Sequence, residues 1–450
     1  LGDVYKRQPK SPKDMAEAII KILKNKELAE KMSLNAKRAV KEKFTLEIMT
    51  RNIEKLYQML LEPKIAFIFS QFPSYDETFI LREIKALKEA GLNFLIFSMK
   101  KCKDKIIQED AKEFLKDTLY IPFISPKVIF TCLYFMIFHP IRFWGTFFYV
   151  LKGNIRSFDF LIKSLVIFPK SVCFAYRLKK LRVKHLHGQW ATHPATIAII
   201  VSRLSGIPFS FTGHAHDIYV DTVMLPEKIE RAEFITTCTG NNKEYLLELI
   251  KRENPKANIK ELEKKIIISY HGVDLSRFKR SNELEDEGDS EKLKIFSVGS
   301  LLECKGFDVL IDACSILKDK GIDFECVIAG GGPLERKLKN QVTSRNLENQ
   351  IKFTGYVTQD KLLPYYKRFD VFALPVKLDI HWGIPNVLLE AMASSMPVIT
   401  TGLPSISELI KDGKTGFIVE ERNPSALAQT LINLYQNKGL KDAICKAGYE

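Results

Sequence analysis

The sequence lacks the patterns that mark several classes of protein. Its eight cysteines are scattered over 450 residues without a CxxC pair, which argues against a disulfide scaffold or a thiolate zinc site and favours reduced thiols in a cytosol. The N-terminal stretch is polar and charged rather than apolar, so no signal peptide is visible. The longest clean apolar run, Val128 to Phe138, is well short of the roughly 20 residues that a membrane-spanning helix needs.

Acidic residues are fewer than basic ones: the 54 Asp and Glu residues are outnumbered by 68 Lys and Arg residues, which gives a net charge of +14. Basic runs lie at 100–103 and 177–182. Such an excess fits an anionic membrane surface, a phosphorylated substrate or nucleic acid. No motif of an RNA- or DNA-binding fold accompanies the charge, so nucleic acid is not expected as a partner.

What is present indicates an α/β protein of more than one domain. Buried-strand patterns alternate with helical patterns, as in parallel sheets covered on both faces. We predict a helical segment at 1–62, a Rossmann-like domain at 63–280, an acidic linker at 281–292 and a second Rossmann-like domain at 293–450. Two such domains would face a cleft, with ligands at the carboxyl ends of their strands.

The first helical segment resembles the end of the chain. Residues 12–28 match residues 424–440 at an offset of 412, including Pro12 with Pro424 and Leu28 with Leu440. Generic amphipathic helices sometimes share such patterns by chance. Our hypothesis is that residues 9–62 are the displaced tail of a second, related copy, fused ahead of a copy that is truncated at Glu450. Folded back, this tail would occupy the missing C-terminal place.

Residues 128–151 are strongly apolar and aromatic, interrupted by His139, Pro140 and Arg142. They fit either a pair of core helices or an interfacial element in peripheral contact with a membrane. The second interpretation depends on the aromatic residues Phe143, Trp144, Phe147, Phe148 and Tyr149, which resemble a membrane-surface belt.

The run from Gly383 to Ala393 carries the clearest chemistry. Gly383 permits close backbone approach, Pro385 pre-sets a first helical turn, and apolar residues at helical spacing predict a helix beginning near Asn386. The free N–H groups at that start would bind an anion, while Glu390, one turn on, could accept hydrogen bonds from two sugar hydroxyls. A nucleotide site is therefore expected.

Further polar groups follow other predicted strands. Lys305, beside Gly306 and after the strand that ends at Gly299, could neutralise a diphosphate, and Gly355 and Val357 could present backbone groups to a base. Six of the eight histidines fall between residues 185 and 271. Their spacing permits zinc, but a substrate-binding role for His214 fits the surrounding polar loop better, so no metal is expected.

From about residue 64 the chain resembles the family 4 retaining glycosyltransferases of the GT-B fold, in particular those that build bacterial surface polysaccharides. The resemblance covers five segments in the family's order: 72–80, 211–219, 270–274, 297–307 and 383–393. Residues 9–60 resemble the closing helices of the same family. This resemblance implies transfer of a sugar, with retained configuration, from a nucleotide-sugar donor to a glycan or lipid-linked acceptor, without a cofactor or metal.

The resemblance also assigns residues. It implies catalytic roles for His214 and Lys305, with acceptor-side candidates Glu77, Thr78, His187 and Asp217. The donor would be bound by Gly299, Ser300, Lys305, Gly355, Val357, Gly383, Ile384, Pro385, Asn386 and Glu390. The chain departs from the family at Ser300, where an Arg is usual, and at Trp382, where an acid is usual.

A sugar-nucleotide epimerase of the same fold and a non-catalytic nucleotide-sugar-binding protein remain alternatives. The expected location is the cytoplasm, at the inner face of the membrane if the aromatic segment binds lipid. The sequence leaves open the donor nucleotide and sugar, the acceptor and linkage, the effect of Ser300 and Trp382, the natural state of the fused chain, and the oligomeric state.

Overall fold

The structure is a computed structural model that describes residues 45–50, 53, 65–74, 78–102, 109–116, 118–155, 157–278, 292–378 and 383–449. The described part of the chain divides into two compact units, one within Leu46–Gly272 and one within Val273–Glu450. The division falls at 272/273, a few residues before the predicted acidic linker, most of which lies outside the described residues.

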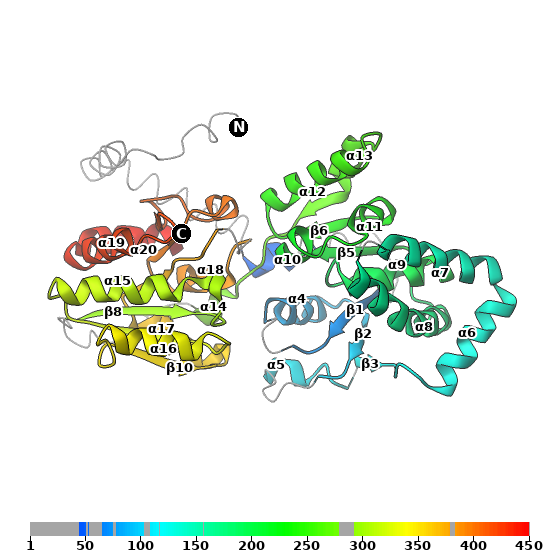
Figure 1. Cartoon of the computed structure of the whole chain (residues 1–450), viewed down its shortest axis with the longest axis horizontal. Coiled ribbons are helices and arrows are strands. Elements are labelled where there is room, and N and C mark those ends of the chain that lie inside the picture. Colours follow the sequence, from blue (N-terminus) through cyan, green and yellow to red (C-terminus); the bar gives the residue numbers. More distant parts are fainter. Residues whose placement is uncertain are drawn as a thin grey trace. The chain divides into compact units, whose positions relative to one another are not determined.

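The unit of Leu46–Gly272, here called the seven-stranded unit, is built on one parallel sheet with the order β3-β2-β1-β4-β5-β6-β7 (Figure 1). Most of its strands coincide with apolar runs that the sequence predicts as buried. The exception is β3, whose residues Thr118-Leu119-Tyr120 do not form an apolar run. The strands are β1 (Ile65–Gln71), β2 (Phe94–Lys100), β3 (Thr118–Tyr120), β4 (His185–Gly188), β5 (Phe209–Gly213), β6 (Ile235–Thr237) and β7 (Ile266–Ile268).

Helices cover this sheet, and α9 is almost entirely buried against β1, β4 and β5. Its C-cap, Gly206 at φ +82°, adopts the left-handed conformation that ends many helices. The helices are α4 (Thr78–Glu89), α5 (Glu109–Lys112), α6 (Pro126–Phe138), α7 (Pro140–Asn154), α8 (Phe158–Lys180), α9 (His193–Ser205), α10 (Ala215–Tyr219), α11 (Leu225–Arg231), α12 (Gly240–Glu253) and α13 (Ile259–Lys265).

The second unit, here called the six-stranded unit, has a parallel sheet with the order β10-β9-β8-β11-β12-β13. Its strands are β8 (Leu293–Val298), β9 (Phe324–Ala329), β10 (Ile351–Gly355), β11 (Val371–Leu374), β12 (Val398–Thr401) and β13 (Phe417–Val419). Its helices are α14 (Leu275–Phe278), η2 (Glu303–Lys305), α15 (Phe307–Asp319), α16 (Glu335–Ser344), α17 (Gln359–Arg368), α18 (Asn386–Ala393), η3 (Pro404–Glu408), α19 (Pro424–Gln436) and α20 (Lys438–Tyr449).

The strand order of each sheet reverses at one point, between β1 and β4 in one unit and between β8 and β11 in the other. Because crossovers between parallel strands are right-handed, helices before and after the reversal lie on opposite faces. Figure 1 shows α15 and α17 on either side of β8. The loops after β8 and β11 therefore leave the carboxyl edge of the sheet at its switch point, which is where open parallel sheets bind their ligands. Two Rossmann-like units are confirmed.

Part of the predicted displaced tail belongs to the seven-stranded unit. Residues 46–50 and 53 are helical, and Met49 and Ile53 are 4% and 6% exposed in a core cluster shared with β1 and α4. The backbone N–H of Gly272 donates to Met49 Sδ at 3.0 Å, and a Cβ on Gly272 would lie 2.7 Å from the Cα of Leu46. The remainder of 1–62 lies outside the described residues.

The aromatic segment 128–151 forms α6 and α7, which meet at a bend of 112°. One side of each helix is buried, including Val128, Thr131 and Phe135 in α6, so the prediction of core helices is correct for that side. The opposite side is apolar and exposed. Among the described residues no single helix is long and apolar enough to cross a membrane, although the α6–α7 pair together has the length and composition of a broken span.

Candidate functional site

In the six-stranded unit, backbone hydrogen bonds join the carboxyl ends of β8, β9 and β10. Gly299, which follows β8, donates to the carbonyl oxygen of Ala329 at 3.0 Å, and Leu301 donates to that of Gly331 at 2.9 Å. Gly330 in turn donates to Gly355 at the end of β10 at 2.8 Å. The glycine-rich turn after β9 thus fixes the position of the loop that carries the predicted anion-binding residues.

Lys305 lies in this loop, at the end of η2 and just before α15. Its stem packs on Gly299, since a Cβ on that glycine would lie 3.7 Å from Lys305 Cδ. The next residue, Gly306, has φ +68°, and a Cβ there would lie 1.9 Å from the carbonyl oxygen of Pro375. Only glycine allows this approach of the β8 and β11 loops. Burial lowers the pKa of Lys305, partly offset by the Cys304 thiol.

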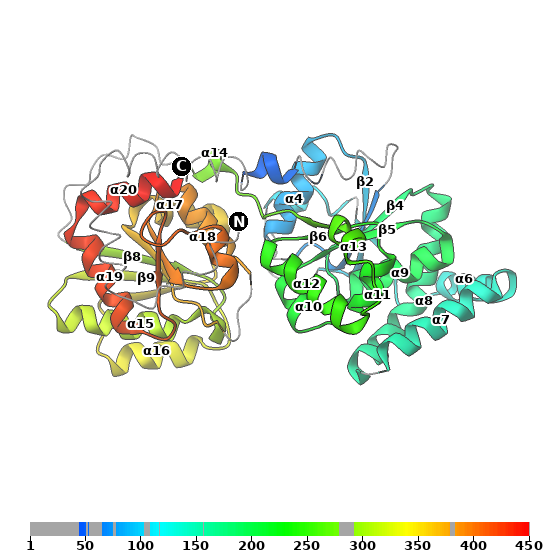
Figure 2. The same cartoon turned by 90° about the horizontal axis from the view of Figure 1, so that it is seen from above.

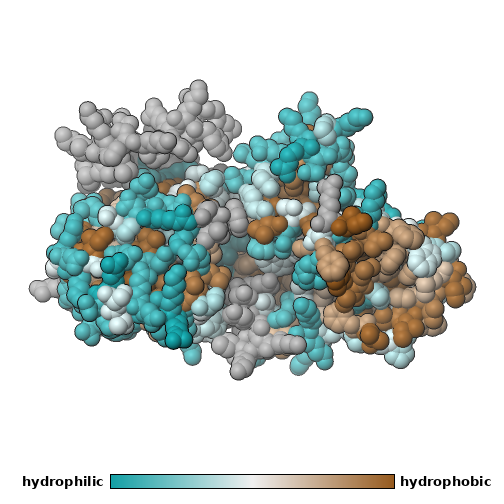
Figure 3. All heavy atoms as spheres, viewed as in Figure 1, coloured by the Kyte–Doolittle hydropathy of each residue, from teal (hydrophilic) through white to brown (hydrophobic). Residues whose placement is uncertain are grey.

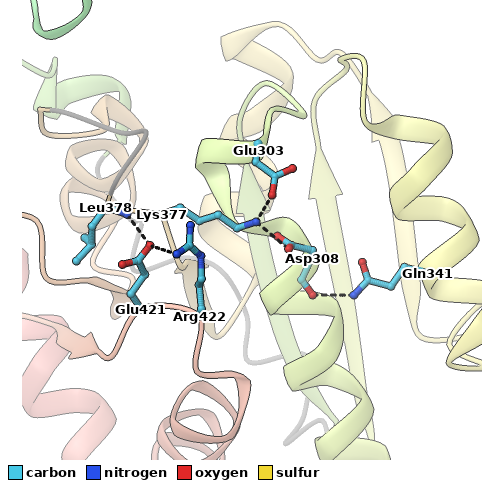
Figure 4. A network of polar contacts seen from close by, with 7 residues as sticks. All are labelled: Glu303, Asp308, Gln341, Lys377, Leu378, Glu421 and Arg422. Carbon is cyan, nitrogen blue, oxygen red and sulfur yellow. Dashed lines mark hydrogen bonds and ion pairs between the residues drawn. The ribbon is translucent and has the colours of Figure 1, made fainter. Parts of the chain in front are cut away.

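A second lysine connects the two loops from behind (Figure 4). Lys377, just after β11, donates from Nζ to Asp308 Oδ2 at 2.9 Å and to Glu303, and its backbone N–H donates to Cys304 at 3.0 Å. Burial by itself lowers the pKa of Lys377, but its bonds to Glu303 and Asp308 outweigh burial and raise it. Lys377 is thus a fixed cation that holds the Lys305 loop against β11.

Opposite this loop, the predicted helix begins at Asn386 as α18, after Gly383 at φ +86° and Pro385 at φ −63°. Glu390 is 4% exposed on this helix. Its Oε1 accepts from Gln359 Nε2 at 2.7 Å and its Oε2 from the Tyr366 hydroxyl at 3.0 Å. A carboxylate accepts about four hydrogen bonds, so these partners orient Glu390 and are compatible with a bound hydroxyl.

The other predicted donor residues follow the same strand ends. Ser300 is exposed beside Gly299, whereas Val357 and Ile384 are partly buried. Gly355 has φ +68° and accepts the bond from Gly330. Trp382 lies outside the described residues. The segments that follow β8 and β11 therefore carry the predicted cation and the predicted helix start at the carboxyl edge of one sheet.

In the seven-stranded unit, His214 follows β5 and is 6% exposed within an aromatic cluster. Its ring centroid lies 4.4 Å from that of Trp190, 5.1 Å from that of Phe79 and 5.5 Å from that of His271. Burial, then the rings of His271 and His187, hold the pKa of His214 well below its usual range. A neutral imidazole here can donate or accept a hydrogen bond but is not a general acid at neutral pH.

One group of side chains in this cluster has the spacing of a metal site. His214, Cys238 and His271 each offer a ligand atom, and these atoms lie within 4.8 Å of one another among the described residues. Imidazole and thiolate together favour zinc. The absence of a metal therefore stays a prediction that must be tested on the protein.

The acceptor-side candidates fall in different surroundings. Asp217 is fully buried in α10 and accepts from the Ala191 N–H, and burial raises its pKa to about 7. His187 is buried within the sheet, with Nδ1 2.8 Å from Ser210 Oγ and Nε2 2.9 Å from Thr212 Oγ1. To bond to the His187 ring, an acceptor substrate would have to displace the hydroxyl of Ser210 or of Thr212. Thr78 begins α4, and Glu77 lies outside the described residues.

Sequence reasoning missed the residues that position the predicted ones. Lys377 is a charged residue three positions after a predicted strand, which is a usable signal, but its partners Glu303 and Asp308 come from a different loop. The aromatic residues around His214 and the pair Gln359 and Tyr366 around Glu390 come from distant segments. No local pattern connects such residues.

The comparisons with known proteins agree with this geometry. Residues 279–450 match the family described as glycosyl transferases group 1. This part of the chain is a group 1 glycosyl transferase domain. Over 152 residues the chain is 38% identical to the amylovoran biosynthesis glycosyltransferase AmsK of Erwinia amylovora, covering 33% of this chain and 37% of that protein. It spans about two fifths of the length of the curated relatives it matches first.

A second relative is the GDP-mannose-dependent alpha-(1-6)-phosphatidylinositol monomannoside mannosyltransferase of Mycobacterium tuberculosis, 28% identical over 189 residues, or 40% of this chain and 49% of that protein. Among solved structures, Anabaena HepE, in complex with UDP and glucose, superposes with a TM-score of 0.59 at 15% identity over 86% of this chain and 94% of that chain. The two parallel sheets with flanking helices thus form the GT-B fold.

Proposed function

We propose that the chain transfers a sugar from a nucleotide-sugar donor to a glycan or lipid-linked acceptor in polysaccharide biosynthesis. The observation that carries this proposal is the switch point of the six-stranded sheet, where the loop of Lys305 follows β8 and the segment leading to α18 follows the neighbouring strand β11. A cation and a helix N-terminus suit a diphosphate, and Glu390 suits a ribose. The group 1 domain and the amylovoran relative support the same reaction class.

We further propose that the reaction retains the anomeric configuration and needs no metal. In that mechanism Lys305 and the N–H groups at 383–386 stabilise the charge that develops on the diphosphate leaving group. His214, held neutral by its burial, would contact the donor sugar or its phosphate through a hydrogen bond.

Calorimetry with a panel of uridine and guanosine nucleotide sugars tests the donor site. Lys305→Ala and Glu390→Gln should each weaken binding by about tenfold or more, because each removes a charged partner of the ligand. Matched controls are Lys318→Ala, in the last turn of α15, and Glu348→Gln, on the surface. The proposal fails if no nucleotide sugar binds, or if both site variants bind like the parent.

Product analysis separates the enzyme classes. A glycosyltransferase yields a sugar attached to acceptor, whereas an epimerase yields an isomerised free nucleotide sugar and a binding protein yields neither. Treatment with EDTA should leave transfer unchanged. If chelation abolished transfer and zinc restored it, while Cys238→Ser did not respond to zinc, the cluster of His214, Cys238 and His271 would be a metal centre.

A further inference from the structure

Exposed apolar side chains are concentrated on one part of the seven-stranded unit. Of 17 large hydrophobic residues that are exposed among the described residues, 15 lie between residues 123 and 166. The other two, Val220 and Leu302, are isolated. Figure 3 shows the hydrophobic surface gathered over the region of α6, α7 and α8. A patch of this extent is far beyond the scattered apolar residues that are normal on a soluble surface.

Each of the three helices contributes an outer apolar face at helical spacing. In α6 this face consists of Ile129, Phe130, Leu133 and Ile137, whereas Val128 and Phe135 point into the core. The outer faces of α7 and of the start of α8 consist of Ile141, Trp144, Phe148, Phe158, Ile162, Leu165 and Val166. A helix that is apolar on both sides needs a second apolar partner beyond its own core.

The inner faces of these helices pack against the rest of the unit. The helices therefore cannot rotate to bury their outer apolar faces. The ring of Phe168 in α8 packs edge-on against Phe143 and Phe147 of α7, at centroid distances of 5.5 Å and 5.3 Å. The guanidinium of Arg203 lies 4.2 Å from the ring centroid of Tyr149. The aromatic contacts fix α7 on the unit and present its other side outward.

The bend between α6 and α7 forms a projecting apolar tip. Phe138 ends α6 and Ile141 lies in the first turn of α7, and they are 66% and 88% exposed. In both Figure 1 and Figure 2 the α6–α7 pair extends away from the sheet of its own unit. A projecting apolar tip suits insertion into a deformable medium better than capture of a peptide.

The charged residues around the apolar patch indicate which kind of surface it binds. Exposed cations at Lys127, Arg142, Lys152 and Lys163 border the apolar residues, whereas Asp159 is the sole carboxylate among the described residues of 122–166 and is paired with Lys163. A two-fold contact between copies would bring this positive surface against itself. An anionic lipid leaflet complements it instead.

We propose that α6, α7 and the start of α8 form a membrane-binding surface that inserts the α6–α7 bend shallowly into an anionic bilayer. Phe138 and Ile141 enter the acyl region, Trp144 and Phe148 lie at its boundary, and the cations contact lipid phosphates. The cytoplasmic leaflet carries anionic lipid, so this surface fits the inner-face location that the sequence predicts. Lipid binding is measured without donor or acceptor, so it stands or falls independently of the proposed reaction.

Flotation with vesicles tests this surface. The protein should float with vesicles rich in phosphatidylglycerol and much less with phosphatidylcholine alone. The double variant Phe138→Asp/Ile141→Asp should lose at least tenfold in partitioning, because two apolar anchors are removed. Val220→Asp, an exposed apolar residue of the same unit outside the patch, is the matched control and should float like the parent, with circular dichroism confirming that both variants fold.

A second variant tests the contribution of the cations separately from that of the apolar side chains. Lys127→Gln/Arg142→Gln should weaken binding to the anionic vesicles by about tenfold to thirtyfold and leave the weak binding to neutral vesicles unchanged. The proposal is overturned if the parent binds neither vesicle. It is also overturned if the protein forms dimers that Phe138→Asp/Ile141→Asp dissociates while lipid has no effect, since the patch would then be an interface between copies.

Discussion

A Cβ atom on Gly330 would lie 1.9 Å from the carbonyl oxygen of Gly299. This approach is possible because Gly330 has φ +144° and no side chain, and it lets the turn after β9 support the loop after β8. The neighbouring Gly331 has no such constraint, since its nearest atom would be 4.0 Å away. The close approach of the two loops therefore requires glycine at position 330 but not at position 331.

We therefore expect Gly330→Ala to displace the Gly299 loop and lower the free energy of unfolding by about 1–3 kcal/mol, as overpacking does. Because Lys305 packs on that loop, nucleotide binding should weaken as well. Gly331→Ala is the matched control and should match the parent in both calorimetry and denaturant unfolding. Equal effects of the two substitutions would contradict the support that we assign to Gly330.

Lys377 provides the second prediction. Its ammonium is 6% exposed and bonds to Glu303 and Asp308, whose own side chains are about half and about two fifths exposed. Lys377→Met should leave two carboxylates near one another and lower the free energy of unfolding by about 1–3 kcal/mol, less than a fully buried pair would cost.

The affinity of Lys377→Met for the nucleotide-sugar donor should fall, because Lys377 holds the Lys305 loop in position. Lys377→Arg retains a cation and should restore part of the affinity, whereas Lys318→Met on the surface of the same unit should change neither property. If Lys377→Met bound donor normally while losing stability, the lysine would stabilise the fold without positioning Lys305.

The strands could be predicted from sequence because each central strand is a short apolar run bounded by glycine, proline or polar residues. β7 (Ile266–Ile268) and β11 (Val371–Leu374) are entirely apolar, and α18 begins at the predicted Asn386. β3 and β13 were not predicted, because β3 is not an apolar run and the positions of both strands depend on pairing with a neighbouring strand.

The site residues likewise divide into those that a local pattern predicts and those whose surroundings come from distant segments. Glu390 and Lys305 could be singled out because they follow strand or helix signals, and their roles in donor binding stay predictions. The environment of His187 could not be read locally, because its partners Ser210 and Thr212 are on the adjacent strand. The same limitation applies to the aromatic segment, where spacing gives two apolar faces but only the packing shows which face is covered.

The N-terminal helical residues provide a third prediction. Met49 and Ile53 lie in the core cluster that contains β1 and α4. Met49→Ala should lower the free energy of unfolding of the seven-stranded unit by about 2–5 kcal/mol, because it removes a buried side chain and leaves a cavity. Glu47→Ala, on the exposed side of the same turn, should change it by less than about 0.5 kcal/mol. Chemical unfolding of the full chain measures both, and equal stability of the two variants would exclude a core role for 45–53.

The last prediction concerns acid stability. Burial, and then the nearby His185, lower the pKa of His187 from 6.5 to about 3. Between these values the unfolded chain binds a proton at His187 that the folded chain does not bind. The contribution of this histidine is therefore fully present above about pH 6.5 and is lost as the pH falls, by about 1.4 kcal/mol per pH unit.

His187→Asn removes this titration, although it also disturbs the hydroxyls of Ser210 and Thr212 at every pH. The diagnostic quantity is therefore the pH dependence of the difference in unfolding free energy between the parent and the variant. That difference should shrink as the pH falls from about 6 to about 4, because only the parent loses stability through this ring. His216→Asn, at a largely exposed ring, provides the control. A difference for His187→Asn that stayed constant with pH would mean that the ring is protonated equally in the folded and unfolded chains, and would contradict the lowered pKa of His187.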